Sequence, residues 1–316
     1  MNRPKGGETM ERPKVGIIGL GNIAQKAYLP VLTKETDWEL VGAFSPNRSK
    51  AQRICREYRI RDYTSLPDLL RDCHAVFVHT STDSHDQVVS DSLKKGVDVY
   101  VDKPLASTVE KSQRLVELSE KTGRKLMVGF NRRFAPLYQK IKAGLHPPAL
   151  IRLDKHRIRS SAHLFDFTLL DDYIHLIDTA IWLAGPASFT LHGEVKMKED
   201  GSLLFANHIF SLSNDSSIHT AMHREAGTNM ERLEAITDGK TRRVLHLETL
   251  EVEQDGEKII HTPGAWEQVL KRRGFVDAVQ HFVDSLRGDT PPFVDGREGI
   301  RAQELIEEII QEIRKG

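Results

Sequence analysis

The sequence predicts an α/β protein of two domains. The first is a doubly wound parallel sheet, and the second is an α/β domain with an open, mostly antiparallel sheet. Three observations lead there. The chain has 316 residues, which is roughly two domains' worth. Short apolar runs alternate with helical segments up to about residue 131, and alternating strands separated by turn residues dominate after it.

The first half contains five short apolar runs that are typical of strands buried on both faces. They are VGIIG, ELVGAF, AVFVHT, VDVYVD and KLMVGF, at residues 15–19, 39–44, 75–80, 97–102 and 125–130. Segments with helical periodicity lie between them, at 23–33, 48–58, 84–95 and 108–122. Because strands alternate with helices, we predict a parallel sheet covered on both faces, in a domain spanning residues 13–131.

The second half has a different pattern. Alternating strands are expected at 149–159, 189–197, 203–212, 217–224 and 231–238, and SNDSS, DGK and QDGEK mark turns. Helices are expected at 133–143, 171–184, 266–287 and 297–315. This pattern predicts a second domain at 132–316, with one packed sheet face and one open face.

The composition excludes several classes of protein. Lys plus Arg and Asp plus Glu both number 45, which indicates neither a nucleic-acid nor a membrane surface. No apolar run is long enough to span a bilayer, and residues 1–12 are expected to be a flexible tail rather than a signal peptide. The two cysteines, Cys55 and Cys73, have no metal-site spacing and fit a reducing cytoplasm. We expect no metal.

A glycine-rich turn, Gly19-Leu20-Gly21-Asn22-Ile23-Ala24, follows the first predicted strand and opens the first predicted helix. Such a pattern alone also occurs in ordinary tight turns. Here its position favours a dinucleotide site of the Rossmann type, because Gly19 permits the turn, Gly21 lets a pyrophosphate approach the backbone, and Ala24 allows close packing. The predicted cofactor contacts are Gly19, Gly21, Asn22, Ile23 and Ala24.

The end of the second strand should select between NAD and NADP. An acidic residue there suits the ribose hydroxyl of NAD, but the sequence has Ser45, Asn47, Arg48 and Lys50 instead. A hydroxyl group followed by cations favours the 2′-phosphate of NADP. The alternative is that Arg48 and Lys50 are solvated residues in the first turn of the next helix.

Two further motifs carry chemistry. Lys103, in Asp102-Lys103-Pro104, follows the fifth strand at the sheet edge where ligands bind, although a lysine there can also be a plain surface residue. Asp171 and His175 stand four apart and share a helix face, so the carboxylate can orient the imidazole. The alternative is an acid-rich helix N-terminus.

The most basic part of the chain is residues 152–159. On a strand, Lys155, Arg157 and Arg159 share one face, while Arg152 and His156 share the other. One face could bind an acidic or phosphorylated substrate. The favoured alternative is a solvated or dimer-forming strand surface.

The segments GLGNIA, HTSTDSHDQVV, VDVYVDKPLA, KLMVGFNRRFAPLY and LLDDYIHLIDTAIWLAG together resemble the Gfo/Idh/MocA oxidoreductases, and most closely their MviM/YceM branch, from about residue 13 to 315. The resemblance implies an NAD(P)-binding Rossmann domain and a second domain that binds substrate and often dimerises through its open sheet. It implies hydride transfer between NAD(P) and a hydroxyl or carbonyl carbon of a sugar, polyol or related small molecule.

The resemblance also implies roles for single residues. Lys103 falls on the lysine of the family's E-K-P motif, and Asp171 and His175 fall on its D-x-x-x-H pair. His175 or Lys103 would act as the base. Further cofactor contacts are implied at Thr80, Ser81, Thr82, His85, Asp102, Lys103, Asn131 and Arg132. Two departures affect the expected pocket shape: Asp102 replaces a glutamate, and Thr168-Leu169-Leu170 replaces a glycine pair.

Two other functions share this scaffold. One is an NAD-dependent glycosidase, in which a transient redox step enables bond cleavage. The other is a non-catalytic sensor that binds a dinucleotide and regulates a partner, because fold alone does not establish function.

Overall fold

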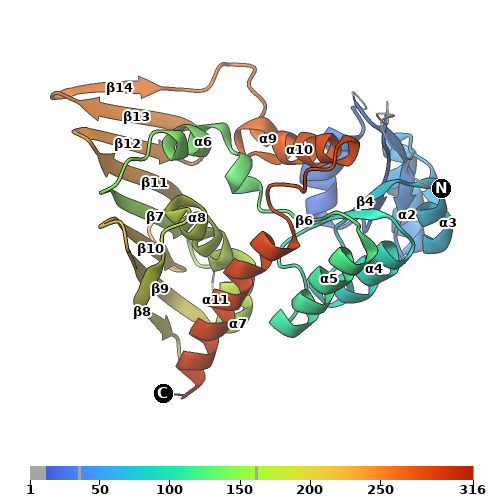
Figure 1. Ribbon diagram of the computed structural model, residues 1–316, viewed down its shortest axis with the longest axis horizontal. Helices are drawn as coiled ribbons and strands as arrows, with labels where there is room; N and C mark the ends of the chain where they lie inside the picture. Colours follow the sequence, from blue (N-terminus) through green and yellow to red (C-terminus); the bar gives the residue numbers. More distant parts are fainter. Residues whose placement is uncertain (1–11, 35–36, 161–162, 316) are drawn as a thin grey trace. The chain divides into compact units, whose positions relative to one another are not determined.

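The computed structural model describes residues 12–34, 37–160 and 163–315, and it divides into two compact units (Figure 1). Unit 1 runs to Phe130 and also contains Phe275–Ile300, whereas unit 2 contains Asn131–Gly274 and the chain from Arg301 onward. The sequence prediction gave all of 132–316 to the second domain. An amphipathic pattern shows that a helix has an apolar face but not which sheet that face covers, so the return of 275–300 to unit 1 could not be read from it. The predicted tail lies almost entirely outside the described residues.

Unit 1 contains a six-stranded parallel sheet in the order β3-β2-β1-β4-β5-β6. Its strands are β1 (Lys14–Ile18), β2 (Glu39–Phe44), β3 (Asp62–Tyr63), β4 (Ala75–Val78), β5 (Asp98–Val101) and β6 (Leu126–Val128). This is the Rossmann order, in which successive strands are added to one side of β1 as far as β3 and to its other side from β4 onward. The predicted doubly wound fold is confirmed.

The helices of unit 1 connect these strands. They are η1 (Ala24–Tyr28), α1 (Leu29–Leu32), α2 (Arg48–Tyr58), α3 (Leu66–Asp72), α4 (Thr82–Lys94), α5 (Val109–Thr122) and α10 (Phe275–Arg287). The sequence analysis missed β3 and α3. A two-residue strand is too short to show a period, and α3 is marked mainly by its cap, where the Ser65 hydroxyl accepts from the N–H of Asp68.

Helix α10 completes the core of unit 1. The ring of Phe282 lies 5.4 Å from Phe77 of β4 and 5.6 Å from Tyr100 of β5, edge to face in both cases. The ammonium group of Lys125 donates to the carbonyl groups of Ser285, Gly288 and Thr290, at the end of the same helix. A cation at a helix C-terminus satisfies carbonyl groups that have no partner within the helix.

Unit 2 contains an eight-stranded sheet in the order β14-β13-β12-β11-β7-β10-β9-β8. The strands are β7 (Leu150–His156), β8 (Phe189–Met197), β9 (Leu203–Leu212), β10 (Ser217–His223), β11 (Met230–Thr237), β12 (Lys240–Leu245), β13 (Thr249–Gln254) and β14 (Glu257–His261). Only β7 and β10 pair in parallel, so the predicted mostly antiparallel sheet is confirmed.

The strands β12, β13 and β14 were anticipated only through their turns. Asp238-Gly239 and Asp255-Gly256 each have two consecutive residues with positive φ, which is the conformation of a tight hairpin turn. The strands themselves are rich in charged residues on both faces, and β14 is exposed throughout. They therefore lack the apolar alternation that identifies a half-buried strand.

The helices of unit 2 are η2 (Asn131–Phe134), α6 (Pro136–Ala143), α7 (Phe165–Thr168), η3 (Leu169–Tyr173), α8 (Ile174–Ala184), α9 (Val269–Arg272) and α11 (Gly296–Lys315), the last of which begins in unit 1. Helix α8 is buried along its whole length and packs on β7 and β10 (Figure 1). It therefore covers one face of the sheet. Ile151, Leu153 and Lys155 of β7 are buried, while Arg152 on the opposite face is exposed.

A buried ion pair joins η2 to α8. The Arg133 guanidinium donates to the Asp178 carboxylate, with Nε–Oδ2 at 3.0 Å and Nη2–Oδ1 at 2.7 Å. Both side chains are only 1% exposed. Asp178 lies three residues after His175 on the same helix, and its ion pair with Arg133 joins two structural elements of unit 2.

Candidate functional site

The glycine-rich turn has the geometry that a dinucleotide requires. Gly19 has φ +89°, and a Cβ there would lie 2.7 Å from the backbone of His79 and Thr80, so a side chain cannot be accommodated. A Cβ on Gly21 would lie 3.7 Å from the His79 carbonyl oxygen, an ordinary contact. Gly21 is thus not required by the fold itself, and its lack of a side chain leaves room for a ligand to approach the backbone.

The helix after this turn begins with exposed Asn22 and Ile23, followed by buried Ala24. Its first full turn, η1, is π-helical, a feature that is frequent at functional sites. The Gln25 side chain donates to the carbonyl groups of Leu20 and Gly21 at 3.0 and 3.2 Å and holds the turn in place. The predicted packing role of Ala24 fits its complete burial.

The residues after β2 have structural partners that the sequence did not reveal. The Arg48 guanidinium donates to the Asp62 carboxylate at 2.5 Å and to the Tyr63 carbonyl at 2.8 Å. The Asn47 side chain caps α2 by accepting from the N–H of Lys50. Asp62 offsets the charge of Arg48, so the argument for NADP now depends mainly on Ser45 and Lys50.

Lys103 follows β5 at the carboxyl edge of the sheet, and it is half-buried. Its backbone N–H donates to the Asp102 carboxylate at 2.9 Å. Because β1, β4 and β5 are adjacent and parallel, this edge also carries the Gly19 turn and the segment from Thr80. Unit 1 thus brings the predicted glycine-turn, Thr80–Thr82 and Lys103 positions to one sheet edge, where ligands of such sheets bind.

His85 is buried between two backbone carbonyl groups. Its Nδ1 lies 3.0 Å from the Pro104 oxygen, and its Nε2 lies 3.2 Å from the Thr80 oxygen. Burial lowers the pKa of this imidazole. The ring connects the start of α4 to the segment after Lys103, so it can position Lys103; the predicted cofactor contact remains a prediction.

His79 is a buried titratable group in unit 1 that the sequence analysis did not single out. Its ring stacks on Tyr28 at a centroid distance of 3.8 Å, and neither ring nitrogen has a hydrogen-bond partner among the described residues. Burial, with a smaller contribution from His85, lowers its pKa to about 3.

We expect His79 to make the protein acid-sensitive. An unfolded histidine titrates near ~6.5. Between that pH and about 3 the unfolded state therefore binds a proton that the folded state does not, and stability falls as the pH falls. The dependence should approach about 1.4 kcal/mol per pH unit. Urea unfolding between pH 7 and 4.5 measures it, and His79→Phe, which keeps a ring against Tyr28, should show a shallower loss. Equal slopes in the two proteins would contradict this assignment.

Asp171 and His175 lie on consecutive turns of the helix in unit 2. Asp171 is in the π-helical turn η3 and is exposed, whereas His175 is in α8 and is 8% exposed. The Thr179 hydroxyl donates to the His175 carbonyl at 2.7 Å. Their catalytic roles remain predictions.

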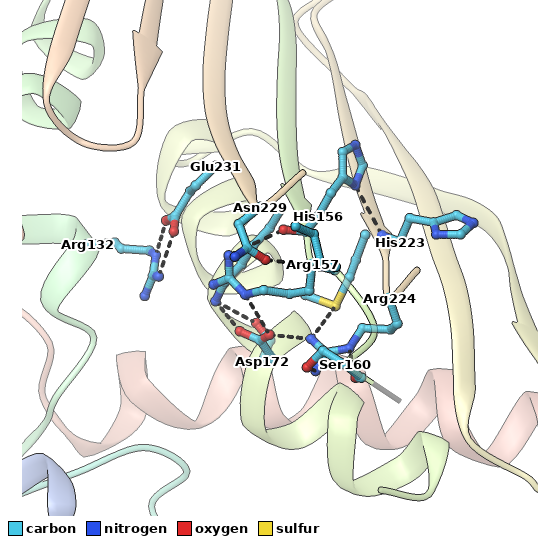
Figure 2. A network of polar contacts seen from close by, with 12 residues as sticks. Arg132, His156, Arg157, Ser160, Asp172, His223, Arg224, Asn229 and Glu231 are labelled. Carbon is cyan, nitrogen blue, oxygen red and sulfur yellow. Dashed lines mark hydrogen bonds and ion pairs between the residues drawn. The ribbon is translucent and has the colours of Figure 1, made fainter. Parts of the chain in front are cut away.

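Asp172, which the sequence analysis passed over, is the carboxylate with the most charged neighbours in this region (Figure 2). It contacts Lys155, lies 2.5 Å from Arg224 Nη1, and lies 3.8 Å from Arg157 Nε. Burial alone would raise the pKa of Asp172, but Lys155, Arg157 and Arg224 outweigh it and hold the pKa well below its usual range. The alternation of Lys155 and Arg157 was the one sequence signal for this arrangement.

Asn131 and Arg132, predicted to contact the cofactor, have partners within unit 2. The Asn131 side chain donates to the Arg273 carbonyl at 2.7 Å. Arg132 donates to the Glu231 carboxylate through Nε at 2.5 Å and Nη2 at 3.1 Å (Figure 2). Burial would raise the pKa of Glu231, yet Arg132 and Lys155 lower it to about 2.

Within residues 12–34, 37–160 and 163–315, no three His, Cys, Asp or Glu side chains are grouped so that they could hold a metal ion. Over the same residues, none of the helices combines the length and apolar character that crossing a membrane requires.

Comparison with known proteins follows the two units. Residues 13–130 match the oxidoreductase family with an NAD-binding Rossmann fold, and residues 136–255 match the YceM-like C-terminal domain. A Salmonella typhimurium protein named "Putative oxidoreductase YceM" is 46% identical over 299 residues, which cover 94% of this chain and 97% of that protein. This chain belongs to the Gfo/Idh/MocA oxidoreductase family.

Solved structures agree with membership of the Gfo/Idh/MocA family. The MviM dehydrogenase of Clostridium difficile is 44% identical and superposes with a TM-score of 0.92, over 95% of this chain and 99% of that chain. UDP-N-acetylglucosamine 3-dehydrogenase of Acidithiobacillus ferrooxidans superposes with a TM-score of 0.82 at 21% identity, over 95% of this chain and 97% of that chain, and shows the fold alone. The chain is an oxidoreductase with an NAD-binding Rossmann domain, in the MviM/YceM branch of the family.

Proposed function

We propose that this protein transfers a hydride between NAD or NADP and a hydroxyl or carbonyl carbon of a polyol, a sugar or a related small molecule. The observation that carries the proposal is the shared sheet edge of the Gly19 turn, the Thr80 segment and Lys103 in unit 1. An inositol 2-dehydrogenase of Shouchella clausii is 29% identical over 54% of this chain and 52% of its own length, which supports the substrate class.

Three residues of the chain would take part in the reaction together with the bound cofactor. The nicotinamide supplies the acceptor or donor of the hydride. Lys103 donates a hydrogen bond to the reacting oxygen and stabilises its developing negative charge. His175 accepts the hydroxyl proton in the oxidative direction and returns it in the reductive one, and Asp171 orients its ring. Lys103 is the other group that can serve as the base.

Fluorescence titration with NADPH and, separately, NADH tests the proposal. Ser45 and Lys50 favour NADPH, whereas the Arg48–Asp62 ion pair favours NADH because it offsets the positive charge of Arg48. Gly21→Ala should weaken binding roughly ten-fold or more, because its methyl group occupies the space through which the pyrophosphate approaches. Gly227→Ala is the matched control, since a Cβ there meets nothing within 4 Å.

The outcomes separate the candidate functions. Binding of neither cofactor contradicts the proposal. Binding without turnover of sugars or polyols favours the sensor, and product formation without net cofactor reduction favours the glycosidase. An effect of Gly227→Ala equal to that of Gly21→Ala would show that the loss of binding is not local to the turn.

We also propose that the open face of the unit 2 sheet pairs with a second copy of the chain. Leu150, Ile209 and Ile236 are 47%, 38% and 42% exposed, and Leu150 and Ile236 are paired on neighbouring strands. Sedimentation velocity measures the assembly, and a monomer would contradict this proposal.

The buried free thiols of Cys55 and Cys73 support a cytoplasmic location.

A further inference from the structure

Four cationic side chains gather on the helix-covered face of unit 2, and Figure 2 labels the three arginines among them. Lys155 is on β7, Arg157 directly follows β7, Arg224 follows β10, and Arg132 lies in η2. We call these four residues the cation cluster. They surround two carboxylates, Asp172 and Glu231.

The charges of this region do not balance. Four cations face two carboxylates, and adding the exposed Asp171 still leaves one positive charge in excess. Burial and the positive charge of Arg132 lower the pKa of the Lys155 ammonium to about 8, although Asp172 and Glu231 act to raise it. Like charges held together in a partly buried site are stabilised by a further anion.

Arg157 is the member best able to receive that anion. Arg224 uses Nε and Nη2 on Ser160 at 2.7 Å each and Nη1 on Asp172 at 2.5 Å. Arg132 donates hydrogen bonds to the Glu231 carboxylate through two nitrogens. Arg157, in contrast, has a 3.8 Å ion pair with Asp172 and a 3.3 Å hydrogen bond to the His156 carbonyl, and its side chain is 29% exposed.

A guanidinium carries five donors in a planar fork that matches carboxylate and phosphate oxygens. The two contacts of Arg157 engage Nε and Nη1. Among the described residues its Nη2 makes no hydrogen bond, so the fork retains donor capacity for a ligand.

The cluster adjoins the residues proposed for proton transfer. Asp172 follows Asp171 directly and precedes His175 by three residues, on the same helical segment. We propose that the substrate is an anionic polyol or sugar derivative, and that Arg157 binds its carboxylate or phosphate group while Asp172 and Arg224 fix the position of Arg157. This rests on the proposed function, because it concerns the substrate of that reaction.

Isothermal titration of the NADH- or NADPH-saturated protein tests this inference, because bound cofactor prevents phosphates from occupying the glycine turn. The probes are sorbitol, gluconate and sorbitol 6-phosphate, which are neutral, carboxylated and phosphorylated members of one series. We expect the dissociation constant of an anionic probe to be lower than that of sorbitol by about ten-fold or more. The difference between gluconate and sorbitol 6-phosphate identifies which anion the site prefers.

Three variants on the same stretch of chain provide the comparison. Arg157→Met should abolish the preference for the anionic probes, and Arg157→Lys should retain part of it, since the charge remains and the fork is lost. Arg152→Met is the matched control, because Arg152 is an exposed arginine on the opposite sheet face and should leave the preference unchanged. Cofactor affinity should be the same in all three variants.

Equal binding of sorbitol and both anionic probes would overturn the inference while leaving the proposed function intact. So would an anion preference that survives Arg157→Met, or one that Arg152→Met removes equally. If neither cofactor binds, the proposed function fails, and the same titrations on the protein alone still decide whether Arg157 binds anions.

Discussion

Replacing Lys103 with alanine is expected to reduce kcat by about 10²- to 10⁴-fold while leaving cofactor affinity unchanged. The side chain stands at the carboxyl end of β5, next to the strand end that carries the Thr80 segment. Its ammonium group is proposed to act on the reacting oxygen rather than on the pyrophosphate. The loss should therefore fall on the chemical step, which single-turnover kinetics with bound cofactor measures.

Lys94→Ala is the matched control for Lys103→Ala, because Lys94 is an exposed lysine at the end of α4 in the same unit. It should leave kcat unchanged. Turnover that persists in Lys103→Ala at the wild-type rate would remove Lys103 from the mechanism. Comparing the pH profiles of Lys103→Ala and His175→Asn identifies the base, since the variant that lacks the base should lose the limb that its titration produces.

Replacing Arg133 with methionine is expected to destabilise unit 2 by about 3–5 kcal/mol. The Arg133–Asp178 pair is 1% exposed on both sides, so the variant leaves a carboxylate buried without its cation. The double variant Arg133→Met with Asp178→Leu should recover most of the loss, because it removes both charges and keeps apolar volume. Urea unfolding followed by circular dichroism measures all three proteins.

An exposed ion pair supplies the control for that experiment. Arg53 and Glu57 lie 3.6 Å apart on α2, with side chains 64% and 62% exposed. Arg53→Met should change stability by less than about 0.5 kcal/mol, because such pairs are screened by solvent. A double variant at Arg133 and Asp178 that is no more stable than the single variant would show that the uncompensated charge is not the source of the loss.

The sequence predicted the features whose cause is local. The Gly19 turn follows from a steric demand that the residue itself meets, and the Asp-Gly turns before β12 and β14 follow from their backbone preference. The alternation of strands and helices likewise predicted both sheets, because each element carries its own period.

What the sequence did not reveal depends on contacts between distant residues. Asp171 and Asp172 are adjacent, and what distinguishes Asp172 is the approach of cations from other strands, including Arg224, which lies 52 positions away. The sequence alone predicts Arg48 as a phosphate ligand, because it does not show that Asp62 of β3 lies beside it. In both cases the missing information is the identity of the neighbouring strand, which no local pattern contains.

The division of unit 1 has a consequence for how the protein is made. Its sheet ends at β6, yet Phe282 and the helix end that Lys125 caps belong to Phe275–Ile300. During synthesis at about 5–20 residues per second, roughly 7–30 seconds separate the emergence of residue 130 from that of residue 275. Over that interval the apolar sheet surface that α10 later covers is exposed in the nascent chain on the ribosome. We expect a chaperone that recognises apolar surface to bind there during synthesis.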